Sequence, residues 1–77
     1  MWSELSEIIR FHRKKAGLTQ NELADMAGIG KTAVFDLEKG RVSARLETVQ
    51  KILSVLNIEA EFQSSMMEQY RASRERS

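Results

Sequence analysis

The sequence predicts an all-α fold, a bundle of four to five short helices, on three observations. Apolar residues recur at intervals of three and four along most of the chain. Helix-start signals and glycines then divide the chain into segments of helical length. Finally, 77 residues suffice for one domain only. Because a core of this size supplies about 3–5 kcal/mol of net stability, a second subunit would help.

The first two helices are separated by a short turn. We expect the first over residues 3–15, where apolar side chains fall on one face, with Gly17 closing it. Thr19 and Glu22 have the spacing of a capping box, in which each side chain accepts a hydrogen bond from the other residue's backbone amide. The second helix therefore starts after Thr19 and runs to about Ala27.

Two further helices follow a reversal of the chain at 28–30, which reads Gly-Ile-Gly. Glycines permit the positive φ angles that a tight reversal requires. We expect the third helix over 31–39, ended by Gly40, and the fourth over about 45–56.

The segment 58–63 alternates between apolar and polar residues, which is the period of a half-buried β-strand. Its apolar residues are Ile58, Ala60 and Phe62. One strand alone is not stable, and nothing else in the chain has the pattern of a strand. We therefore expect this strand to pair with its copy in a symmetry-related chain and to hold a homodimer together.

Residues 64–77 are polar and contain three arginines. We expect a frayed helix or a flexible tail here. Such a tail is either solvated or serves as an arm that binds DNA or a partner protein.

The run 28–32, GIGKT, looks like the end of a phosphate-binding loop and raises the question of a nucleotide-binding enzyme. Asp25, however, stands where the first glycine of that loop belongs, and no strand precedes the run. The chain has no Cys and a single histidine, His12, which cannot form a zinc site by itself. We expect no enzyme activity, no metal and no cofactor.

Composition and charge indicate where the protein acts. No apolar run approaches the roughly 18 residues of a membrane span, so we expect no membrane partner and a cytoplasmic location. The net charge of +1 argues against a sequence-blind coat on nucleic acid. Residues 31–45, however, carry four basic side chains against two acidic ones, as an edge that contacts phosphates requires. A solvated charged face would show the same composition.

Two short helices joined by a glycine-containing reversal are the pattern of a helix-turn-helix, whose second helix enters the DNA major groove. The segments GLTQNELA at 17–24, GIG at 28–30 and DLEKG at 36–40 together resemble the Cro/repressor (XRE-like) helix-turn-helix family. The resemblance covers about 8–56 and implies a lambda-repressor-like bundle. The extension LETVQKILSVLNIEAEF is most similar to the small antitoxins of the HipB and Y4mF kind.

The resemblance also implies roles for single residues. Lys31, Thr32 and Phe35 would read bases, although Phe35 either contacts a thymine methyl group or packs against Leu18 or Ile29. The residues implied to contact the DNA backbone are Gln20, Gly30, Arg41, Arg45 and Arg10.

Two positions complete this comparison with the family. Arg13 and Glu38 match a pair that forms a structural ion pair between the first helix and the end of the third. Gly30 begins the third helix where Ser or Thr is commoner, and glycine still caps a helix acceptably.

These features predict a DNA-binding domain over 1–63 and a polar tail over 64–77. The domain would bind double-stranded DNA as a homodimer at an inverted repeat. The implied function is a transcriptional repressor, an antitoxin that regulates its own operon and binds a HipA-like kinase toxin. The alternatives are a phage-type or stand-alone repressor without a toxin, and a protein-interaction module that retains the fold.

Overall fold

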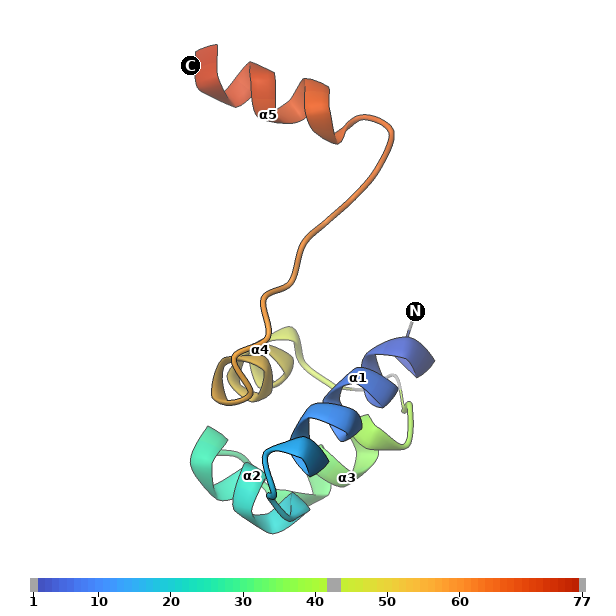
Figure 1. Ribbon diagram of the computed structural model, residues 1–77, viewed down its shortest axis with the longest axis vertical. Coiled ribbons are helices and arrows are strands. Elements are labelled where there is room, and N and C mark those ends of the chain that lie inside the picture. The colour runs from blue at the N-terminus through green and yellow to red at the C-terminus, as the bar shows by residue number, and fades with distance from the viewer. Residues whose placement is uncertain (1, 42–43, 77) are drawn as a thin grey trace.

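The computed structural model describes residues 2–41 and 44–76, and these residues form five α-helices. Their bounds are Trp2–Lys15 for α1, Gln20–Ala27 for α2, Lys31–Glu38 for α3, Leu46–Val55 for α4 and Met67–Arg76 for α5. Helices α1 to α4 gather into a bundle, and an extended linker leads from α4 to α5 (Figure 1). The predicted all-α fold is confirmed, and the four helices of the bundle lie within one residue of their predicted bounds.

The start of α2 has the predicted capping box. The backbone amide of Glu22 donates to Thr19 Oγ1 at 3.0 Å, and the amide of Thr19 donates to Glu22 Oε1 at 2.9 Å. Two hydrogen bonds lower the pKa of the Glu22 carboxyl group below its ordinary value. The larger effect comes from the Thr19 backbone amide and the smaller from the Thr19 side chain. The chain is therefore fixed locally where the helix-turn-helix begins.

The turn between α2 and α3 requires a left-handed residue at one position only. Gly28 has a φ of 70° and a ψ of 35° and caps the C-terminus of α2, with its amide donating to the carbonyl groups of the last turn. Gly30, the N-cap of α3, has a φ of −71° and a ψ of 146°, which any residue can adopt. Both glycines permit a positive φ, and the chain uses one at Gly28 alone.

The core lies between the four helices of the bundle. Five aliphatic side chains are fully buried, and each helix contributes at least one: Ile9 from α1, Leu23 from α2, Val34 and Leu37 from α3, and Ile52 from α4. Burying each such side chain is worth about 1.5–3 kcal/mol relative to leaving it in water. Helix α2 packs against both α3 and α4, and α1 packs against α3. The inner face of α3 is thereby held firmly while its outer face stays free.

The strand predicted over 58–63 is not formed in the single chain, since these residues have no regular secondary structure. Asn57 ends α4 with a φ of 57°, and the amide of Ile58 then donates to the carbonyl of Leu53 at 2.9 Å. Ile58 packs against the core, whereas Ala60 and Phe62 are exposed. A strand requires a partner for its backbone groups, and the described residues supply none. Pairing with a second chain therefore stays a prediction.

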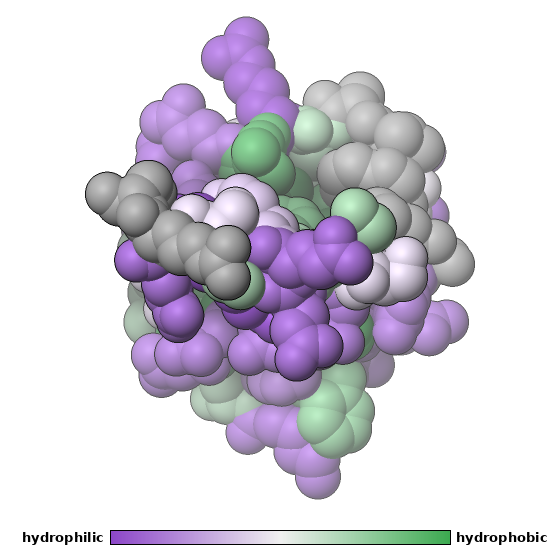
Figure 2. Space-filling model, turned by 90° about the horizontal axis from the view of Figure 1, so that it is seen from above, coloured by the Kyte–Doolittle hydropathy of each residue, from purple (hydrophilic) through white to green (hydrophobic). Residues whose placement is uncertain are grey.

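The segment predicted as a polar tail contains helix α5. The Ser64 hydroxyl accepts a hydrogen bond from the amide of Met66 at 3.2 Å, and Arg74 lies 6.0 Å from the ring centre of Tyr70, one helical turn away. Seen from the end at which α5 lies, the surface is mostly hydrophilic, with apolar residues in small separate patches (Figure 2). Within the part of the chain that the structure describes, no helix has the length and apolar character needed to cross a membrane.

Candidate nucleic-acid interface

The outer face of α3 is the surface on which the predicted base-reading residues lie. Lys31, Thr32 and Phe35 are all exposed, and Phe35 is 42% exposed. The Phe35 ring is therefore not part of the buried core, and the choice between a thymine methyl contact and packing against Leu18 or Ile29 stays a prediction. A shallow hollow of about 210 Å³ adjoins this face, lined by Gln20, Asn21, Lys31, Thr32 and Phe35.

The N-terminus of α3 is not covered by a side chain. Gly30 is its N-cap and makes no side-chain capping hydrogen bond. The first amides of a helix have no partner within the helix, and together with the helix dipole they favour an anion. This end of α3 therefore suits a phosphate group beside the residues that face outward.

The ion pair expected between Arg13 on α1 and Glu38 at the end of α3 is present. Arg13 donates through Nε to Glu38 Oε2 at 2.7 Å and through Nη2 to Glu38 Oε1 at 3.0 Å. The two side chains are only 11% and 4% exposed. The hydrogen bonds to Glu38 hold the pKa of Arg13 above its ordinary value. The pair fastens α1 to α3.

Gln20, a predicted DNA-backbone contact, is connected to this pair. Its Nε2 atom donates to Glu38 Oε1 at 3.2 Å. The amide is therefore held in one orientation, because a carboxylate can only accept and so faces the NH₂ group. Gln20 lines the hollow beside Lys31 and also a second hollow between α1, α2 and α3.

This second hollow has a volume of about 220 Å³. It is lined by Arg10, Arg13, Gln20, Phe35, Glu38 and Lys39. Arg10 is thus brought next to the helix-turn-helix, as a backbone contact requires. Sequence reasoning placed Lys39 only within the basic strip 31–45 and gave no role to Asn21. For Lys39, its spacing of four residues from Phe35 is the signal that was available, since residues so spaced are neighbours on a helix.

The remaining predicted backbone contacts, Arg41 and Arg45, follow α3 and both lie near Asp36. Arg41 Nη1 is 3.1 Å from Asp36 Oδ1 in an exposed ion pair, so part of its charge is already compensated. Arg45 is the N-cap of α4, and its side chain lines a hollow together with Asp36 and Thr48. Residues 42 and 43, between these two arginines, lie outside the described residues. Arg41 and Arg45 therefore flank the outer face of α3.

His12 and the acidic residues do not form a site. His12 is half-buried on α1, and its Nδ1 atom donates to the carbonyl of Ile8 at 2.7 Å. Within residues 2–41 and 44–76, no group of three or more His, Asp or Glu side chains is placed to hold a metal ion.

The arrangement of α2, the turn and α3, with an exposed α3 flanked by cations, defines a helix-turn-helix domain. Comparison with known families agrees, since a family model described as helix-turn-helix matches residues 9–63. The chain therefore belongs to the helix-turn-helix family. The predicted membership of the Cro/repressor (XRE-like) type is confirmed.

Curated relatives carry the same domain. An uncharacterized HTH-type transcriptional regulator of Methanothermobacter thermautotrophicus is 44% identical over 52 residues, which span 68% of this chain and 75% of that protein. The HTH-type transcriptional regulator y4mF of Sinorhizobium fredii is 35% identical over 54 residues, 70% of this chain and 71% of that protein. A third regulator, from Archaeoglobus fulgidus, is 40% identical over 53 residues, 69% of this chain and 76% of that protein.

A solved structure named MDT Protein has a similar fold. It superposes with a TM-score of 0.76 at 26% identity, covering 84% of this chain and 92% of that chain. The similarity therefore extends beyond the helix-turn-helix to most of the chain.

Proposed function

We propose that this protein is a cytoplasmic, sequence-specific transcriptional repressor that binds double-stranded DNA as a homodimer. The observation that carries the proposal is the outer face of α3. Lys31, Thr32 and Phe35 are exposed there, while Val34 and Leu37 fasten the opposite face to the core. The relatives named as transcriptional regulators support the same function.

Binding would place α3 in the major groove with its N-terminal residues against base edges. The Lys31 ammonium group suits the acceptors of guanine, the Thr32 hydroxyl accepts several partners, and the exposed Phe35 ring suits a thymine methyl group. Each good contact of this kind discriminates between bases by about 1–3 kcal/mol. Three such side chains give limited sequence specificity in one subunit. A dimer doubles the number of base contacts.

The dimer would form through 58–63, where Ala60 and Phe62 are exposed and the backbone has no ladder partner among the described residues. Two symmetry-related domains bind an inverted repeat whose half-sites lie about 34–36 Å apart, or a multiple of this distance. Replacing Ala60 with proline removes a ladder donor and should reduce the dimer fraction measured by light scattering. An Ala60→Ser variant, which keeps the backbone donor, is the matched control.

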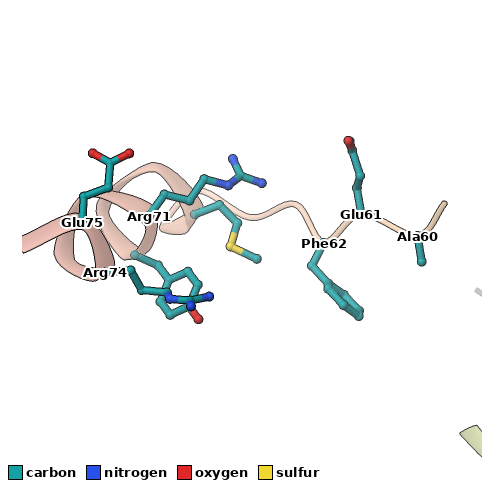
Figure 3. A pocket seen from close by; sticks show the side chains of 8 residues that line it. Ala60, Glu61, Phe62, Arg71, Arg74 and Glu75 are labelled. Carbon is teal, nitrogen blue, oxygen red and sulfur yellow. The ribbon is translucent and has the colours of Figure 1, made fainter. Parts of the chain in front are cut away.

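A second candidate is that the repressor is also an antitoxin that binds a HipA-like kinase toxin and regulates its own operon. The observation favouring it is the concave surface between the linker and α5, about 720 Å³ in volume (Figure 3). Phe62 is 75% exposed beside it, and Tyr70, Arg71 and Arg74 line its α5 side. The antitoxin role predicts a kinase-like reading frame next to the gene of this protein. The kinase-like product should co-purify with this protein.

The alternatives to the antitoxin differ in what else they predict. A phage-type or stand-alone repressor would bind its operator yet co-purify with no neighbouring product. A protein-interaction module would keep the fold and bind no DNA. Co-purification and DNA binding measured on the same preparation therefore separate the three.

The test of DNA binding is an operator selected from a random duplex library, followed by titration at several salt concentrations. About 6–10 neutralised phosphates should weaken binding roughly 10³–10⁵-fold between 50 and 200 mM salt. Lys31→Ala should relax the base preference at one position of each half-site. Arg45→Ala should weaken binding to all sequences alike, and affinity that does not change with salt would exclude the proposed function.

A further inference from the structure

The linker between α4 and α5 carries two kinds of side chain in alternation. Successive side chains of an extended chain point to opposite sides, and here apolar residues alternate with Glu59, Glu61 and Gln63. Among the apolar residues, Ile58 packs against the core, whereas the Phe62 ring is 75% exposed. Glu59 and Glu61 are both exposed, and neither forms an ion pair within the part of the chain that the structure describes. Two negative charges of the linker therefore lack a cation.

Helix α5 lies across a hollow from this linker. The hollow has a volume of about 720 Å³. Glu61 and Phe62 line it from the linker, and Arg71 and Arg74 line it from α5. Figure 3 shows Glu61 and Arg71 on one side of the chain, and Phe62 and Arg74 on the other. Helix α5 therefore offers one arginine to each side of the linker.

The two arginines of the hollow are in different situations. Arg74 lies 6.0 Å from the centre of the Tyr70 ring, within the range of a cation–π contact. Arg71 is exposed and forms no ion pair with any of the residues 2–41 and 44–76. Arg71 is therefore the cation of α5 that is available to a carboxylate, and it lies on the side to which Glu61 points.

Symmetry and the alternating pattern together limit how two copies of the linker can pair. In an antiparallel pair, residues directly opposite each other lie on the same face. The apolar faces therefore coincide only when the two-fold axis passes through a residue and not between two residues. With the axis at Ala60, Ile58 of each chain lies opposite Phe62 of its partner. The exposed ring then covers a residue that packs on the core.

The same register places Glu59 opposite Glu61 of the other chain, on the polar face. Like charges directly opposite each other on a sheet destabilise the pair. The two-fold axis repeats this contact, so one face of the ribbon carries the carboxylates of both chains. A two-stranded ribbon is only marginally stable by itself. A cation at this face would therefore stabilise the dimer.

We infer that α5 closes over the second chain of the homodimer and that Arg71 of each chain pairs with Glu59 of the partner subunit. Neighbouring strands lie about 4.7–4.9 Å apart, so a partner strand that enters the hollow lies between the linker and α5. The guanidinium group has enough donors for its own Glu61 and for the partner's Glu59. The pairing rests on the homodimer of the proposed function, to which it adds α5 as part of the interface.

Two variants of opposite charge test whether the contact runs between chains. In the homodimer of Glu59→Arg, and equally in that of Arg71→Glu, positions 59 and 71 of different chains carry like charges. In a heterodimer of the two variants, both of these contacts join opposite charges. Contacts within one chain are the same in every dimer, and those between positions 59 and 61 sum to the same total. Neither of these therefore favours the heterodimer.

Native mass spectrometry of an equimolar mixture of the two variants measures this preference. The heterodimer should make up well over the half of all dimers that random pairing gives, because both like-charge contacts are relieved at once. A fraction of one half overturns the inference, since a contact between Arg71 and Glu61 of the same chain gives that result.

The matched control is a mixture of Glu59→Arg with Lys51→Glu. Lys51 is an exposed lysine on α4 that pairs with Glu47 of its own chain at 3.4 Å, so this variant has the same net charge as Arg71→Glu. The heterodimer fraction should stay close to one half. Any excess measures the attraction that net charge alone produces, and an excess equal to that of the test mixture overturns the inference.

Arg71→Gln measures the strength of the contact in the natural homodimer. The loss of two exposed ion pairs per dimer should raise the dissociation constant, measured by sedimentation equilibrium at low salt, roughly 2–30-fold. In a Glu59→Gln background the same substitution should have a much smaller effect, because its partner is already neutral. An equal increase in both backgrounds overturns the pairing. Circular dichroism verifies that each variant keeps its helix content.

Other occupants of the hollow give different results. An unchanged dimer of Arg71→Gln that no longer captures a kinase-like neighbour would assign the hollow to that protein and overturn the inference. An unchanged dimer whose DNA affinity depends less steeply on salt would assign Arg71 to DNA and also overturn it. Wild-type protein that stays monomeric up to millimolar concentration would instead refute the homodimer of the proposed function.

Discussion

Breaking the ion pair between Arg13 and Glu38 should destabilise the domain more than any change at an exposed charge. The pair is bidentate, with contacts of 2.7 and 3.0 Å, and both side chains are almost fully buried. Arg13 also donates through Nη1 to the carbonyl of Leu18 at 2.8 Å. One side chain therefore connects α1 to the start of the helix-turn-helix and to its end.

The expected magnitude follows from the burial of the two charges. Replacing one partner leaves the other charge uncompensated, which costs about 3–5 kcal/mol. A domain of this size has a net stability of about the same magnitude. Arg13→Met or Glu38→Leu alone should therefore bring the folded and unfolded states to comparable populations at 25 °C.

The double variant Arg13→Met/Glu38→Leu should recover much of this loss, because a buried ion pair replaced by apolar side chains is often neutral or stabilising. Urea unfolding followed by circular dichroism gives the free energies for the double-mutant cycle. Lys51→Met is the control, since the exposed pair with Glu47 is worth only about 0.3–0.5 kcal/mol. The reasoning is refuted if Arg13→Met costs no more than Lys51→Met.

The other predictions concern the core, the turn and the capping box. Ile52→Ala, at a fully buried position, should lower the free energy of unfolding by about 2–5 kcal/mol. Gly28→Ala should cost about 1–2 kcal/mol, since the added Cβ meets no atom within 4 Å and the cost comes from the left-handed backbone. Gly30→Ser should instead stabilise by a few tenths of a kcal/mol through a new N-cap. Because the Glu22 pKa is lowered on folding, its contribution is complete above the ordinary pKa, about 4.3, and is lost as the pH falls through the folded value.

Urea unfolding and NMR titration test these predictions. Urea midpoints compare the two glycine variants, and equal changes at Gly28 and Gly30 would contradict the assigned backbone conformations. For Ile52, an unchanged midpoint would show that the side chain is not in the core. NMR titration of the Glu22 carboxyl group, repeated in Thr19→Ala, should show a lowered pKa that moves back toward its ordinary value.

The bundle was predictable because local chemistry determines its boundaries. Thr19 and Glu22 specify where α2 begins without any knowledge of the rest of the fold. The spacing of Val34 and Leu37 predicts the inner face of α3, and the resemblance to the family implied the outward positions of Lys31 and Thr32. Phe35 could not be decided in this way, because an aromatic side chain at an outward position can turn toward the core or away from it.

The rest depends on contacts between segments distant in the sequence. Lys39 lies in the basic strip that composition reveals, yet its relation to Arg10 arises only from the packing of α1 on α3. The alternating pattern of 58–63 predicts a strand that pairs, whereas these residues have no regular secondary structure in the single chain, so the pairing stays a prediction. The alternation of apolar and polar residues alone therefore cannot distinguish an extended linker from an edge strand that pairs with a second chain.

The glycines of the turn show how one residue type can serve two purposes. Gly28 is required by its φ of 70°, which other residues adopt only with strain. Gly30 has an ordinary extended backbone, so conformation does not explain it. Glycine differs from serine at this position because it has no hydroxyl that could accept a hydrogen bond from the first amides of α3. Those amides then stay open to an external anion, and a DNA-binding regulator that uses them gives up a small amount of helix stability for a phosphate contact. Gly30→Ser should therefore gain folding stability and lose affinity for DNA, and a gain in both would show that the open amides make no contact.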